Sequence, residues 1–97
     1  MEFNEIKEKA IEGTQYRLKK KNIENTVDLI ALHLTEEVGE IMAQIMNGKL
    51  KRKEIDVKNI GEEISDSIIL LMTLSKHYNI NLEKAILEKI EDVRSKN

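Results

Sequence analysis

The chain of 97 residues has no cysteine, no proline and no tryptophan, and its aromatic residues are two tyrosines and one phenylalanine. Without cysteine, disulfides and zinc–thiolate sites are excluded. Isoleucine, leucine, lysine and glutamate dominate instead, which is a composition typical of an all-helical protein. With 40% hydrophobic and 35% charged residues, the chain is neither disordered nor membrane-like in composition.

Long hydrophobic runs are also missing. The longest uninterrupted apolar run, Ile68 to Met72, falls far short of the roughly 20 residues that a membrane-spanning helix needs. The first ten residues, MEFNEIKEKA, are charged and lack the apolar core of a signal peptide. The net charge of −2 gives no electrostatic reason for binding nucleic acid. We therefore expect a cytoplasmic protein that binds neither membranes nor nucleic acid.

The spacing of apolar residues predicts four helices and no strand, so the expected fold class is all-α. Helix starts are placed at side chains that cap helix N-termini, and the second helix is expected to stop at an Asn-Gly pair. The expected helices run from about Asn4 to about Lys21, from Asn25 or Thr26 to Asn47-Gly48, from Asp56 to about Tyr78, and from Asn81 onward.

The small size of the chain bears on its assembly. A domain of this size buries only about 60–65% of its unfolded surface, so a core formed by one chain alone is marginal. The second and third helices are apolar on more than one side, which indicates burial on more than one side. We expect a single helical domain over residues 1–97 whose antiparallel helices complete a bundle by homo-oligomerisation, as a homodimer or homotetramer.

Acidic residues interrupt the apolar stripes of the two central helices. Glu37 and Glu40 lie one turn apart on the second helix, and Glu63 and Asp66 repeat that spacing on the third. On antiparallel neighbouring helices the two pairs would meet, and a divalent cation would relieve their repulsion. Ligation by oxygen alone suits Mg²⁺ or Mn²⁺. Spacing alone leaves two interpretations open, a metal site or acids on solvated helix faces.

A family resemblance favours the metal site. Residues 36–40 (EEVGE) and 63–66 (EISD), separated by the 22 residues 41–62, resemble the EExxE…ExxD signature of the MazG-like all-α nucleotide pyrophosphohydrolases. The similarity covers about residues 27–94. It implies a helical oligomer that uses Mg²⁺ to cleave an NTP or dNTP to the monophosphate and pyrophosphate. The metal ligands that it implies are Glu37, Glu40, Glu63 and Asp66.

The resemblance also implies roles for residues around the metal. Glu36 or Glu37 would accept the proton of the attacking water, and Lys89 and Arg94 match basic positions that would contact substrate phosphates. Val93 stands where the family usually has an asparagine, which is a departure at the phosphate end of the site. No Ser, Cys or Thr lies in a recognisable nucleophile arrangement, so direct attack by water is favoured.

Two alternatives remain at this stage. The first is a phosphoribosyl-ATP pyrophosphohydrolase, an enzyme with related helices and acids; the EEVGE segment and the apolar run at 68–72 favour the MazG-like interpretation over it. The second is a non-catalytic helical module whose acids bind metal only structurally or whose helices serve interaction. The retained set of four acids argues against this module, whereas Val93 argues for it.

Overall fold

The computed structural model describes residues 2–20 and 27–96, and within these ranges it contains four α-helices and no strand. The expected all-helical class is therefore confirmed. The caps expected at Asn25 or Thr26 lie outside the described residues. The helices are α1 (Phe3–Lys20), α2 (Val27–Lys49), α3 (Val57–His77) and α4 (Leu82–Ser95).

The N-termini of α3 and α4 begin at the caps that the sequence predicts. The Asp56 carboxylate accepts a hydrogen bond from the backbone N–H of Asn59 at 3.1 Å, and the Asn81 side chain accepts one from the backbone N–H of Lys84 at 3.2 Å. Both cap residues have an extended backbone. Each cap satisfies one of the N–H groups that the first turn of a helix leaves without a partner.

The end of α2 differs from the expected stop at Asn47-Gly48. The helix runs on to Lys49, and the residue with left-handed backbone conformation is Lys51, whose φ is 59°. The Arg52 N–H donates to the Asn47 carbonyl at 2.9 Å, and the Lys51 N–H donates to the Gly48 carbonyl at 3.1 Å. These two bonds form a Schellman motif, with lysine at the position that most often holds glycine.

Gly48 has a different role, in packing. A Cβ atom at this position would lie 2.6 Å from Cδ1 of Ile55 and closer still to its Cγ1. The missing side chain therefore makes room for Ile55, which packs on the last turn of α2. This contact closes the connection between α2 and α3.

A second Schellman motif ends α3 and confirms the break predicted before the last helix. The Ile80 N–H donates to the Ser75 carbonyl at 2.9 Å, and the Asn79 N–H donates to the Lys76 carbonyl at 3.0 Å. Asn79 has a φ of 53°, a conformation that asparagine tolerates better than most residues. The Lys7 ammonium group donates to the Ile80 carbonyl at 3.2 Å, which ties α1 to this turn.

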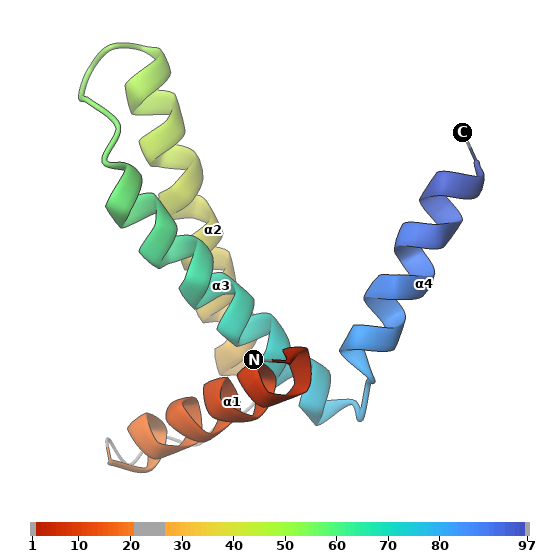
Figure 1. The fold of residues 1–97 in the computed structure, drawn as a ribbon. Helices are drawn as coiled ribbons and strands as arrows, with labels where there is room; N and C mark the ends of the chain where they lie inside the picture. Colours follow the sequence, from red (N-terminus) through yellow and green to blue (C-terminus); the bar gives the residue numbers. More distant parts are fainter. Residues whose placement is uncertain (1, 21–26, 97) are drawn as a thin grey trace.

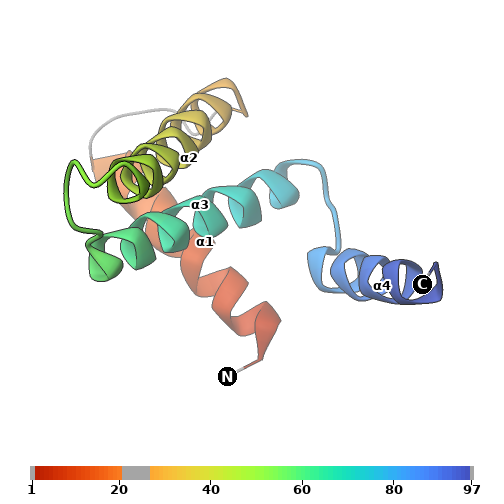
Figure 2. The same ribbon diagram turned by 90° about the horizontal axis from the view of Figure 1, so that it is seen from above.

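The helices α2 and α3 lie side by side and antiparallel, α1 crosses α3, and α4 stands apart from the other three (Figures 1 and 2). The radius of gyration is 15.9 Å, whereas a compact domain of 100 residues has about 13 Å. The extended shape follows from the position of α4. A single chain thus does not close into a compact bundle.

The interior of the chain is small. The buried hydrophobic residues among those described are Ile11, Ile30, Ile41 and Met72. Ser67, Thr73 and Ser75 of α3 are buried as well, and each hydroxyl donates to a backbone carbonyl three or four residues earlier, at 2.9, 2.9 and 2.7 Å. These hydroxyls are satisfied within their own helix, so they can be buried without partners elsewhere.

Several apolar faces remain exposed. They are formed by Val38, Met42, Ile45 and Met46 on α2, by Ile64, Ile68 and Leu71 on α3, and by Ile86, Ile90 and Val93 on α4. Contiguous exposed apolar surface of this kind is typical of interaction sites. None of the described helices combines the length and the apolar character needed to cross a membrane.

Candidate metal centre

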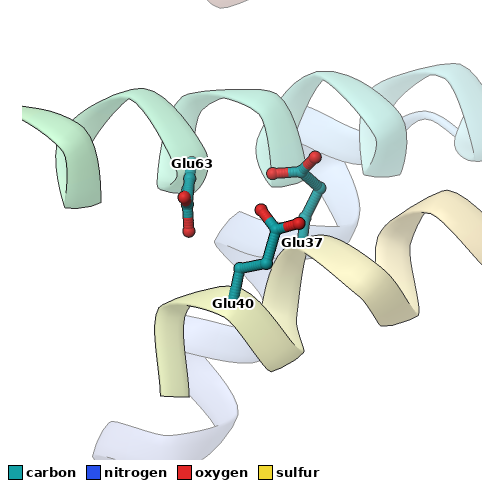
Figure 3. A group of neighbouring side chains, drawn as sticks. All are labelled: Glu37, Glu40 and Glu63. Carbon is teal, nitrogen blue, oxygen red and sulfur yellow. The ribbon is translucent and has the colours of Figure 1, made fainter. Parts of the chain in front are cut away.

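The antiparallel pairing of α2 with α3 brings three of the expected acids together. Glu37 and Glu40 from α2 and Glu63 from α3 each offer a carboxylate oxygen, and these three oxygens lie within 4.8 Å of one another. Figure 3 shows the three side chains in the space between the two helices. A single cation can therefore contact both helices at this point.

Glu63 is the most restrained of the three acids. Its Oε1 accepts a hydrogen bond from the side-chain amide of Asn59 at 3.2 Å. Its Oε2 is buried and has no hydrogen-bond partner in the described part of the chain. A buried carboxylate oxygen without a partner is unfavourable, because it has lost its water and gained nothing in return. A bound cation would remove this deficit.

The pKa of Glu37 is raised above its ordinary value. Burial is the largest cause, followed by the negative charges of Glu40, Asp66 and Glu63, while His33 acts in the opposite direction. Burial and neighbouring negative charge both disfavour the ionised carboxylate. The arrangement therefore favours either a proton or a cation at Glu37.

The other two acids expected at the site have different positions. Asp66 is exposed, and its charge contributes to the raised pKa of Glu37, so it lies within electrostatic range of the cluster. It is not part of the group of three oxygens that lie within 4.8 Å. Glu36 is exposed and is also outside this group. Asp66 thus borders the cluster, and Glu36 faces solvent beside it.

The two basic residues expected to contact phosphate are both on α4. Lys89 Nζ lies 3.8 Å from Asp92 Oδ2, and Arg94 Nη1 lies 3.8 Å from Glu91 Oε2. Such exposed pairs contribute little to stability, so both side chains are free to make other contacts. Because α4 stands apart from α2 and α3, one chain does not bring them to the acids (Figure 1).

The donor set fits a small divalent cation. All three clustered groups are carboxylates, the oxygen ligands that Mg²⁺ and Mn²⁺ prefer. The buried Oε2 of Glu63 is an acceptor without a donor, as expected of a ligand atom. The geometry therefore defines a helical hairpin with a carboxylate cluster that could hold a divalent cation.

Comparison with known proteins identifies the family. The model of the protein family described as the MazG nucleotide pyrophosphohydrolase domain matches residues 25–97. The chain therefore belongs to the MazG family, as its acidic motifs predict, and this membership indicates a nucleotide pyrophosphohydrolase in general terms. No curated protein and no solved structure matches the chain.

Asn59 is the residue at this site that the sequence analysis missed. Its amide binds Glu63, yet nothing in the motif pattern marks it. The spacing could have indicated this contact, since Asn59 lies four residues before Glu63 and therefore on the same helix face. Polar neighbours at this spacing from a proposed ligand are candidates for contact with it.

Proposed function

We propose that this protein hydrolyses a nucleoside triphosphate, NTP or dNTP, to the monophosphate and pyrophosphate. In this proposal Mg²⁺, or Mn²⁺, is held by Glu37, Glu40, Glu63 and Asp66. The observation that best supports it is the buried Oε2 of Glu63, which has no partner in the described structure and belongs to a side chain facing two further carboxylates.

When bound, the cation would offset charge on the phosphate oxygens and lower the pKa of the attacking water. Glu40 in α2 and Glu63 in α3 offer carboxylate oxygens from two neighbouring helices, so the bound cation would lie between these helices. Glu37 is one proposed acceptor of the water's proton, through a carboxylate oxygen that the cation does not hold. Glu36, exposed beside the site, is the second proposed acceptor.

Lys89 and Arg94 are the proposed contacts to the substrate phosphates. Both carry positive charge and are exposed on α4. By helical position, Lys89 borders the stripe formed by Ile86 and Ile90. Since α4 lies apart from the acids of its own chain, these contacts require α4 to repack or to come from a second copy.

We further propose that the single domain functions as a homodimer or homotetramer. Two observations support this. The exposed apolar faces of α2, α3 and α4 are unfavourable in water. The radius of gyration of 15.9 Å also exceeds that of a compact domain of this length. Packing between copies would bury these faces and complete the bundle.

The activity is tested by incubating the protein with NTPs, dNTPs and phosphoribosyl-ATP, with and without Mg²⁺, and measuring pyrophosphate release. We expect release from at least one NTP or dNTP, and only when the cation is present. Release from phosphoribosyl-ATP alone would support that alternative. No release from any compound, under conditions where Mg²⁺ binds, would overturn the enzyme proposal and leave a metal-binding module.

A further inference from the structure

Asn59 links the start of α3 to the carboxylate cluster. Its backbone N–H is held by the N-cap, donating to Asp56 Oδ1 at 3.1 Å. Its side chain extends one turn along the helix and donates from Nδ2 to Glu63 Oε1 at 3.2 Å. The two hydrogen bonds use different groups of Asn59, so the side chain can act on Glu63 without weakening the cap.

The Asn59 amide makes the two oxygens of Glu63 differ in their hydrogen bonding. An ionised carboxylate can only accept hydrogen bonds, so the amide must present its NH₂ group to it. Oε1 is engaged by that group, whereas Oε2 is buried and has no partner among the described residues. The Glu63 side chain itself points from α3 toward α2, where Glu37 and Glu40 lie (Figure 3). Oε2 is therefore the Glu63 oxygen that most needs a cation.

We propose that Asn59 is a positioning residue that restricts Glu63 to coordination through one oxygen and thereby makes the site select Mg²⁺ over Ca²⁺. The inference rests on the metal site of the proposed function. Ca²⁺ takes six to eight oxygen ligands and readily accepts both oxygens of one carboxylate, whereas Mg²⁺ requires octahedral geometry and keeps several waters. A cation bound through both Glu63 oxygens would share Oε1 with the Asn59 amide, whose hydrogen bond draws electron density from that oxygen and disfavours this mode of binding.

Helix propensity supports a role in positioning. Asparagine is a weaker helix former than alanine, so the helix itself does not favour it at this place. Hydrogen bonds to ligating carboxylates orient them, and loss of such a partner typically weakens metal binding by about 10- to 100-fold. The contact to Glu63 gives asparagine a function here that alanine cannot supply.

The test measures Mg²⁺ and Ca²⁺ dissociation constants by calorimetry without nucleotide. Asn59→Ala is expected to weaken Mg²⁺ binding by about 10- to 100-fold and Ca²⁺ binding by less, so that the Mg²⁺ preference falls. Asn59→Asp keeps the size but cannot donate, and it must lower the preference too. Asn59→Gln keeps an amide donor and should retain part of the preference for Mg²⁺ over Ca²⁺. Ser65→Ala, on the same helix and exposed, is the matched control and should leave both constants unchanged.

The outcomes separate the two proposals. If the wild type binds Mg²⁺ and the alanine and aspartate variants keep its preference over Ca²⁺, the role of Asn59 is wrong and the metal site stands. If the wild type binds neither ion, the metal site of the proposed function is wrong as well. Far-ultraviolet circular dichroism of each variant checks that α3 remains helical; the cap bond uses the Asn59 backbone and should persist in all of them.

Discussion

Glu37 in α2 and Glu63 in α3 place carboxylate oxygens within 4.8 Å of each other across the antiparallel helix pair. Two like charges at this distance repel, and burial strengthens the repulsion because less water screens them. The helices therefore pack against an electrostatic penalty that a proton or a cation can remove. The stability of the hairpin should therefore depend on pH and on the concentration of divalent cation.

The first prediction concerns Glu37 and pH. Its pKa is raised in the folded state, so between the ordinary carboxyl value of about 4.3 and the raised value the folded protein binds more protons than the unfolded protein. The contribution of Glu37 to stability must then fall as pH rises through this window. We expect Glu37→Gln to be more stable than the wild type at neutral pH without cation, with the difference vanishing at low pH, as measured by thermal unfolding.

The same variants can be compared by thermal unfolding with added Mg²⁺. The cation should stabilise the wild type at neutral pH by binding the folded state, and stabilise Glu37→Gln much less. Glu54→Gln, an exposed acid in the connection after α2, serves as the control and should behave like the wild type. Equal responses of the wild type and Glu37→Gln to both pH and Mg²⁺ would contradict this prediction.

The second prediction concerns catalysis. Glu63→Gln retains the size of the side chain but loses the charge that the cation needs. We expect the Mg²⁺-dependent kcat/KM to fall by more than the roughly 10- to 100-fold that loss of an outer-shell partner causes. Glu62→Gln removes the neighbouring exposed acid and should retain full activity, because that residue lies about 100° away around the helix. Full activity in Glu63→Gln would show that the metal ligands are assigned wrongly.

The third prediction concerns the end of α2. Lys51 has a φ of 59°, a conformation that costs a residue with a Cβ roughly 1–2 kcal/mol. Lys51→Gly should therefore raise the free energy of unfolding by about 1 kcal/mol, after allowance for the extra freedom of glycine in the unfolded chain. The neighbouring Arg52→Gly, at a residue without positive φ, should destabilise instead. Urea titration distinguishes the two, and destabilisation by both would argue against strain at Lys51.

The fourth prediction concerns assembly. Ile90 is half-exposed on the apolar stripe of α4, and burying such a side chain contributes about 1.5–3 kcal/mol. A lysine in its place would bring a charge into the proposed interface, so Ile90→Lys should sediment as a smaller species than the wild type. Glu91→Lys introduces the same side chain about 100° away around the helix, outside the apolar stripe, and should keep the wild-type mass. A wild type that sediments as a stable monomer would rule out the oligomer.

The features that the sequence could predict are local ones. Asp56 and Asn81 cap their helices as expected, since capping depends on a side chain and the N–H groups two or three residues later. The spacing of Glu37 from Glu40 likewise placed both on one side of α2. The antiparallel packing of α2 and α3 then brought Glu63 to them.

The features that the sequence did not predict have separate causes. The Asn-Gly pair predicted the end of α2 too early, because the glycine serves the packing of Ile55 and not the helix end. The contact from Asn59 to Glu63 was missed because no motif contains it. The position of α4 relative to the acids could not be predicted either, since α4 packs far less closely on the other described helices than α2 packs on α3.

The four proposed ligands lie between residues 37 and 66, on two helices joined by one short connection. Contacts between residues close in sequence form early and quickly in folding. During synthesis the N-terminal parts of a chain also emerge first. The hairpin that carries the proposed ligands can therefore form before α4, with Lys89 and Arg94, takes up its final position.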